Sequence, residues 1–134
     1  PDINPAYLVK NYTTIDSVWY NYVVEGMYLA VNGEPGSGST ARIAAIPGID
    51  VCGKTGTSQN PHGKDHSVFV AFAPKDNPQI AVAAYIENAG WGASWAAPIA
   101  SLMIEKYLTG EVKRRWLEQH ITNAILIEGR EKKE

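Results

Sequence analysis

The sequence contains a single cysteine, Cys52, so no disulfide can form within the chain, and the redox compartment stays open. It lacks any apolar run approaching the ~20 residues of a transmembrane helix. No signal peptide is visible and the chain begins at Pro1 rather than Met, which suggests a soluble piece cut from a longer protein. Excess charge is also missing: the net charge of −2 argues against a nucleic acid as partner.

The chain has the length of a single domain. Its 134 residues are 45% apolar, which is ordinary for a globular protein and enough for a hydrophobic core. We see no internal repeat and no low-complexity segment. We therefore take residues 1–134 as a single unit that ends in a helix and a charged tail, residues 111–134.

The most unusual stretch is residues 53–58, Gly-Lys-Thr-Gly-Thr-Ser, which follow the strand-like residues 49–51. Glycine inside a strand weakens it and often marks the close approach of a ligand or another backbone. The lysine adds a positive charge, and the hydroxyls add hydrogen-bond donors and acceptors. A strand edge of this composition suits an extended, anionic ligand that lies along it.

Residues 48–55 also satisfy the P-loop pattern G-x-x-x-x-G-K-[ST]. That motif requires a helix directly after it, because the N–H groups at the start of the helix hold the phosphates. Here Gly56 and Pro61 follow within six residues, and no apolar helical period accompanies them. The context therefore argues against a phosphate-binding loop.

The same residues contain a K-T-G box, which serine transpeptidases and β-lactamases carry on a strand. Three later stretches follow it in a fixed order. The sequence resembles the penicillin-binding protein transpeptidase domain, in the form found in class B, elongation-type enzymes, from Asp16 to Gly110. The stretches that carry the resemblance are Gly-Lys-Thr-Gly-Thr-Ser-Gln (53–59), His-Ser-Val-Phe-Val-Ala-Phe-Ala-Pro (66–74), Glu-Asn-Ala-Gly-Trp-Gly (87–92) and Ala-Ala-Pro-Ile-Ala (96–100).

The resemblance implies substrate-binding roles for Lys54, Thr55, Gly56 and Thr57. The lysine would hold the substrate electrostatically, and the two threonine hydroxyls would meet the carboxylate of a stem peptide ending in D-Ala-D-Ala, or of a β-lactam. The backbone N–H of Thr57 would supply half of an oxyanion hole. Period two places the two threonines on one face and Lys54 and Gly56 on the other, so one ligand can reach all four only along the strand edge. The plainer alternative is an edge strand on which Lys54 prevents aggregation.

The parent protein would be a serine D,D-transpeptidase that needs no cofactor and cross-links peptidoglycan through an acyl-serine intermediate. The family implies an inner-membrane anchor, a periplasmic domain and partners in the cell-elongation machinery that sets cell shape. The sequence contains no S-x-x-K, and its one Ser-x-Asn, residues 58–60, overlaps the end of the K-T-G strand, so the resemblance places the nucleophile and its base upstream, and we expect this chain alone to be inactive. A serine β-lactamase-like hydrolase and a non-catalytic module that binds peptides at its sheet edge remain the alternatives.

The other candidate residues give weaker evidence of a functional role. His62, Asp65 and His66 lie in a Gly/Pro turn with no zinc-like spacing, so we expect no metal there. Cys52 is expected to be a small buried residue. Trp91 and Trp95 flank a glycine-rich turn and either border a substrate groove or pack under the last helices.

The pattern of apolar residues predicts an α+β fold, an antiparallel sheet with N- and C-terminal helices on one face. Trp19 lies on the apolar stripe of the first helix and is expected in the core. The middle strand is apolar on both faces and is expected to be buried on both. The small face of the last strand, with Ala81 and Ala83, is expected to receive a helix. The predicted elements are a helix at 16–31, a short strand at 42–46, strands at 51–58, 67–73 and 80–86, a helix with its N-cap at Ser94 that ends at Gly110, and a helix from 111 to about 120.

Because a longer protein would cover the second face of the sheet, we also expect that face to be partly bare here. Either Val68, Val70 and Phe72 or the opposite face with Phe69 would be exposed. Exposed apolar patches drive association. The sequence therefore predicts that the isolated chain self-associates.

Overall fold

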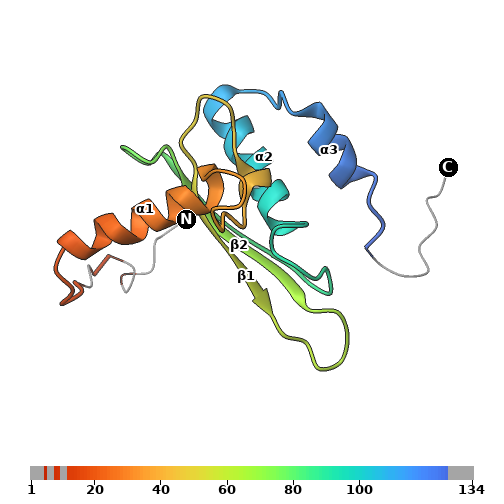
Figure 1. Ribbon diagram of the computed structural model, residues 1–134, viewed down its shortest axis with the longest axis horizontal. Helices are drawn as coiled ribbons and strands as arrows, with labels where there is room; N and C mark the ends of the chain where they lie inside the picture. The colour runs from red at the N-terminus through yellow and green to blue at the C-terminus, as the bar shows by residue number, and fades with distance from the viewer. Residues whose placement is uncertain (1–4, 6–7, 10–11, 127–134) are drawn as a thin grey trace.

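The computed structural model describes residue 5, residues 8–9 and residues 12–126; the predicted charged tail lies outside these ranges. Within them the chain is an α+β structure with one antiparallel sheet, as expected (Figure 1). No helix among the described residues has the length and apolarity to span a bilayer. The elements are α1 (Val18–Asn32), the 3-10 helix η2 (Arg42–Ala44), β1 (Cys52–Ser58), β2 (His66–Ala73), β3 (Ile80–Ile86), α2 (Ala96–Thr109) and α3 (Arg115–Thr122).

The sheet has the strand order β1-β2-β3, and both neighbouring pairs are antiparallel. Residues 74–79, which include Asp-Asn-Pro at 76–78, connect β2 to β3. The register places Thr57 opposite Ser67, and Ser67 opposite Ile86. Among the described residues β1 pairs with β2 alone, so the strand that carries the K-T-G box forms an edge of this sheet.

The hydrophobic core lies between one face of the sheet and α2. Phe69 and Ala71 of β2 and Ala84 of β3 pack there against Ala100 and Ile104 of α2. The helix thus covers the face of β3 that carries the larger side chains, not the small face with its alanines. Covering the larger side chains removes more apolar surface from water, which stabilises this arrangement.

The other face of the sheet is partly bare, so β2 is buried on one side and not on both as predicted. Val70 is 43% exposed, and Tyr85 of β3 is exposed on the same face. The expectation of an exposed apolar face is confirmed for the set Val68, Val70 and Phe72, while the alternative with Phe69 is wrong because Phe69 is fully buried. Nothing within the described residues covers the centre of this face.

Helix α1 has nearly the predicted bounds, but its first half does not enter the core. Trp19 is 59% exposed, against the prediction, and Val31 is the buried residue of this helix. Contact with the sheet is made by the end of the helix, where the Asn32 side-chain amide donates to the Val51 carbonyl at 2.8 Å. Figure 1 shows α1 and α2 on opposite sides of the sheet, so the terminal helices do not share one face. A helical stripe identifies an apolar face without showing what packs on it.

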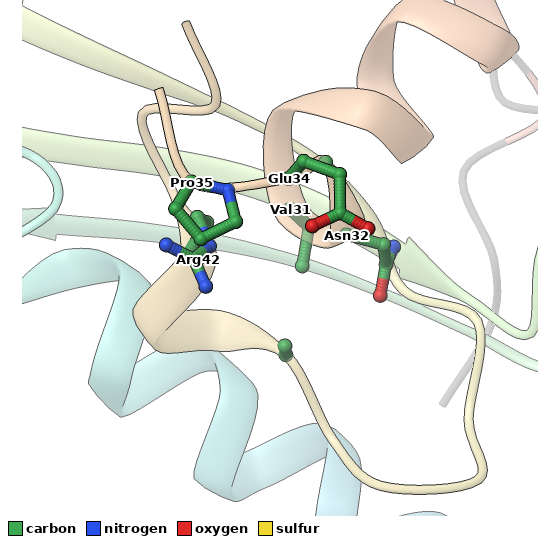
Figure 2. Close-up of a pocket in the computed structure, with 7 residues that line it drawn as sticks. Val31, Asn32, Glu34, Pro35 and Arg42 are labelled. Atoms are coloured by element: carbon green, nitrogen blue, oxygen red, sulfur yellow. The ribbon is translucent and has the colours of Figure 1, made fainter. Parts of the chain in front are cut away.

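The segment between α1 and β1 forms no fourth strand. The N–H groups of Ala44 and Ala45 donate back to the carbonyls of Ala41 and Arg42, which makes the turn η2 instead. A pocket of about 290 Å³ separates this segment from the end of α1 (Figure 2). None of the substrate-binding residues predicted from the sequence lines it.

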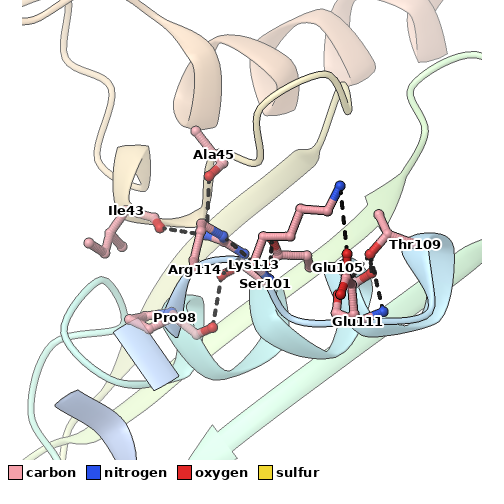
Figure 3. Close-up of polar contacts among 9 residues, drawn as sticks. All are labelled: Ile43, Ala45, Pro98, Ser101, Glu105, Thr109, Glu111, Lys113 and Arg114. Atoms are coloured by element: carbon pink, nitrogen blue, oxygen red, sulfur yellow. Dashed lines mark hydrogen bonds and ion pairs between the residues drawn. The ribbon is translucent and has the colours of Figure 1, made fainter. Parts of the chain in front are cut away.

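A buried charge network holds η2 against the C-terminal helices (Figure 3). The Arg114 guanidinium donates to Glu105 Oε2 and to Ser101 Oγ, both at 3.1 Å, and to the carbonyls of Ile43 and Ala45. A strand at 42–46 would have to direct these carbonyls into a sheet ladder. Because Arg114 donates to these carbonyls instead, this apolar stretch forms a turn and not a strand.

The predicted end of α2 agrees with the structure, whereas the predicted start of the following helix does not. Gly110 ends α2 in the left-handed conformation with φ 80°, as expected. The following helix begins at Arg115 rather than at residue 111. Its Leu117 is buried, whereas Trp116 is 60% exposed.

Candidate functional site

The outer edge of β1 carries the residues that the sequence singled out. Lys54 Nζ donates to the Thr55 carbonyl at 2.8 Å, so this carbonyl points away from β2. In an antiparallel pair, the N–H and C=O of a residue point to the same side, and alternate residues repeat that direction. The N–H of Thr57 therefore faces the outer edge as well. An extended ligand can add to such an edge as a further strand.

The side chains of the box alternate as period two predicts. Thr55 and Thr57 share the face of the buried residues Phe69 and Ser67, while Lys54 lies on the opposite face, on the side of the exposed Val70. The four predicted residues are contiguous on one edge. A single ligand that lies along this edge can contact side chains from both faces of the sheet. Lys54 also lines a pocket of about 320 Å³, together with residues 37–40 and the second half of α1.

Thr40 belongs to this edge, although no sequence pattern indicated it. Its hydroxyl oxygen lies 3.1 Å from that of Thr55, and either group can be the donor. The residue follows a Gly/Ser-rich loop without any period, so local sequence gives no sign of the contact. The pair brings a second hydroxyl to the position where the resemblance places a substrate carboxylate.

The loop between β3 and α2 supports the same strand from beneath. Ser67 Oγ donates to the Trp91 carbonyl at 2.9 Å and accepts from the Ala96 N–H at 3.0 Å. Ser67 therefore caps α2, and Ser94, which the sequence suggested for this role, is exposed. Gly92 is buried against the backbone of Gly56.

The two tryptophans separate into different environments. Trp91 is 77% exposed in the loop after β3. The Trp95 ring stacks on the His120 ring of α3 with centroids 5.5 Å apart, so Trp95 packs against the last described helix. This resolves the open alternative for Trp95 in favour of packing and leaves Trp91 available to solvent.

The contacts of the remaining candidate residues indicate structural roles. Cys52 is buried as predicted, and burial raises the pKa of its thiol, so the neighbouring Lys54 does not activate it. Asp65 Oδ1 accepts from the Asn60 N–H at 3.1 Å, and His66 Nδ1 accepts from the Asn88 N–H at 3.0 Å. Residues 12–126 contain no cluster of three side chains suited to a metal ion.

Comparisons with a family model and with known sequences give consistent matches. The family model described as penicillin binding protein transpeptidase domain matches residues 4–105. The chain is 40% identical over 98 residues to the peptidoglycan D,D-transpeptidase MrdA of Haemophilus influenzae, a match over 62% of this chain and 15% of the relative. It is 41% identical over 78 residues to the peptidoglycan D,D-transpeptidase PbpA of Mycobacterium tuberculosis, over 50% of this chain and 16% of the relative.

Solved structures show the same similarity. The crystal structure of Pseudomonas aeruginosa PBP2 in complex with WCK 5153 aligns with a TM-score of 0.62 at 34% identity, over 75% of this chain and 22% of that one. An imipenem acyl-enzyme complex of penicillin-binding protein A from M. tuberculosis aligns with a TM-score of 0.55 at 34% identity, over 66% of this chain and 19% of that one. The chain thus spans about a sixth of the curated relatives' length.

Proposed function

The chain belongs to the penicillin-binding protein transpeptidase domain family, and from this premise we propose that it forms the substrate-binding strand of a peptidoglycan D,D-transpeptidase. The observation that carries the proposal is the K-T-G box on a free strand edge, with a lysine, two threonines and an outward N–H on four consecutive residues. Two relatives are peptidoglycan D,D-transpeptidases and one similar structure is an acyl-enzyme complex, which supports an acyl-transfer activity.

In this proposal the D-Ala-D-Ala end of a stem peptide, or a β-lactam, lies along the outer edge of β1. The hydroxyls of Thr55 and Thr57 bind its carboxylate, and Lys54 supplies positive charge. Gly56 keeps the strand open to the ligand, since it presents no side chain. The N–H of Thr57 stabilises the negative charge that develops on the carbonyl oxygen when a serine attacks. The peptide's terminal D-Ala leaves, and the acyl group passes from the serine to an acceptor amine.

The nucleophilic serine and its base come from the remainder of the protein in this proposal. No serine of this chain has a lysine three positions later, and an unassisted hydroxyl is a weak nucleophile. Similarity to MrdA and to PBP2 favours an elongation-type enzyme. We extend the proposal to an inner-membrane anchor, a periplasmic site and partners in the cell-elongation machinery.

Labelling of the full-length protein with a fluorescent penicillin tests the function. A transpeptidase gives a stable covalent adduct, visible in a gel and as the added mass of one penicillin. A β-lactamase-like hydrolase releases the label rapidly and turns over penicillin in excess. A peptide-binding module gives no adduct at all, which would overturn the proposal. An adduct on the isolated 134-residue chain would place a nucleophile within it and contradict the assigned division of roles.

A further inference from the structure

We infer that the loop after β3, residues 91–95, supports the strand that carries the candidate oxyanion-binding N–H, with Gly92 and Ser67 as its positioning residues. The inference rests on the proposed function. It concerns two residues that lie outside the K-T-G box and are not expected to touch the substrate. Three observations lead to it.

The first observation is the closeness of two backbones. Gly92 is buried, and a Cβ atom added to it would lie 2.6 Å from the carbonyl oxygen of Gly56, 3.2 Å from the Gly56 nitrogen and closer still to the Val68 carbonyl oxygen. All three atoms are backbone atoms of paired strands, so they cannot swing away as a side chain would. Glycine is the one residue that lets the loop lie against Gly56, the residue before Thr57.

The second observation is how firmly the loop is held. Ser67 is fully buried, and its hydroxyl joins the loop at two points, the Trp91 carbonyl and the Ala96 N–H. The Ala97 N–H donates to the Gly92 carbonyl at 2.9 Å, which ties the loop to the first turn of α2. The loop is therefore fixed both to the middle strand and to the helix.

The third observation is the register, which aligns the support with the site. Ser67 is paired with Thr57, and Val68 with Gly56. The loop therefore lies beneath the two residues whose backbone positions the N–H of the proposed oxyanion hole.

These observations determine which part must yield when residue 92 becomes larger. The loop is held by β2 and α2, whereas β1 pairs on one side alone within the described region. A methyl group at position 92 would therefore clash with both strands at the Gly56–Val68 pair, and we expect Gly56 and Thr57, on the less supported strand β1, to be displaced. A misplacement of about 1 Å in a catalytic group can cost ~10²-fold in rate.

The test compares acylation of full-length variants by a fluorescent penicillin in stopped flow. We expect Gly92→Ala to lower the acylation rate constant by about 10- to 100-fold, with the final labelled fraction close to that of the wild type. A purely structural role would lower the labelled fraction and leave the rate constant of the remaining protein unchanged. That second result would overturn the inference.

Ser67→Ala is the second variant, and it decides the matter if Gly92→Ala does not fold. It leaves the close contact intact but removes both hydrogen bonds that fix the loop, so we expect a smaller fall of the acylation rate constant, of about 10-fold. Ser94→Ala is the matched control, because Ser94 lies in the same loop and its exposed hydroxyl makes no hydrogen bond to the described residues. It should react like the wild type.

The outcomes separate this inference from the proposed function. If the wild-type protein forms no adduct, the proposed function fails whatever the variants do. If the wild type is acylated and Ser67→Ala reacts at the wild-type rate, the function stands and the inference is wrong.

Discussion

The hydroxyl of Thr40 lies 3.1 Å from the hydroxyl of Thr55, which joins the segment after α1 to the strand that carries the candidate site. If Thr40 donates in this pair, the hydrogen of Thr55 stays free to bind a substrate carboxylate. We expect Thr40→Val to weaken the noncovalent binding of a β-lactam by the full-length protein about fivefold, the equivalent of one neutral hydrogen bond of ~1 kcal/mol. Thr40→Ser should behave like the wild type, and equal binding by both variants would show that Thr40 does not orient Thr55.

Lys54 is expected to act in the transition state more than in folding. Within the described part of the chain its exposed side chain makes one hydrogen bond, to the Thr55 carbonyl, so its loss should leave the stability nearly unchanged. Lys54→Ala should slow acylation of the full-length protein by about 10² to 10³, the usual effect of losing an electrostatic anchor. Lys54→Arg should not restore the rate fully, because a planar guanidinium does not replace a compact ammonium. Unchanged acylation in the alanine variant would remove Lys54 from the site.

The bounds of the strands were predictable because their signals are local. Alternating apolar residues define β3 from Ile80 to Ile86, and Gly110 ends α2 through its own backbone conformation. The arrangement of the candidate site was predictable for a similar reason, since Lys54 to Thr57 are consecutive in the sequence. An edge strand places them next to one another without help from distant residues.

The features that the sequence did not predict depend on contacts between residues that are distant in the sequence. Ser67 caps α2 from 29 positions away, so Ser94, the nearest polar residue, was the wrong choice. Thr40 and Thr55 are 15 positions apart and follow no pattern. Trp19 has the spacing of a core residue, but its ring contacts Tyr22 of the same helix and is otherwise largely exposed. Periodicity describes one element, whereas burial depends on its neighbours.

The partly bare face of the sheet predicts self-association of the isolated chain. Val70 and Tyr85 are exposed there, in the middle and last strands of the sheet. We expect a concentration-dependent increase of the sedimentation coefficient. Val70→Lys should suppress it, because a charge is costly to bury in an apolar contact. A clean monomer of the wild-type chain at high concentration would contradict the prediction.

Cys52 should be inert in the folded chain. Burial raises the pKa of its thiol, so the folded state holds the thiol proton more tightly than the unfolded state does. This contribution to stability is complete below the usual thiol pKa of about 8.5 and is lost as the pH rises through and above it. Alkylation by iodoacetamide at pH 8 should be slow in buffer and fast in urea. Equal rates in both solvents would show that the thiol is accessible.

The buried pair of Arg114 and Glu105 should stabilise the fold much more than the exposed pair next to it in sequence. Arg114 is 9% exposed and Glu105 2%, and their Nε to Oε2 distance is 3.1 Å. Arg114→Ala would leave a buried carboxylate without its cation and release the carbonyls of Ile43 and Ala45. Removing one partner of such a pair costs about 3–5 kcal/mol, so the urea midpoint should fall steeply.

Arg115→Ala is the matched control for this prediction, since it removes the same type of side chain one position later. Arg115 pairs with Glu118 at 2.7 Å on the surface, where solvent screens the charges. Its loss should therefore leave the urea midpoint almost unchanged. Because Arg114 also fixes η2, which leads into β1, its loss should increase hydrogen exchange at residues 43–51 before the rest of the sheet. Similar midpoints for the two variants would mean that the buried network contributes no more than a surface ion pair.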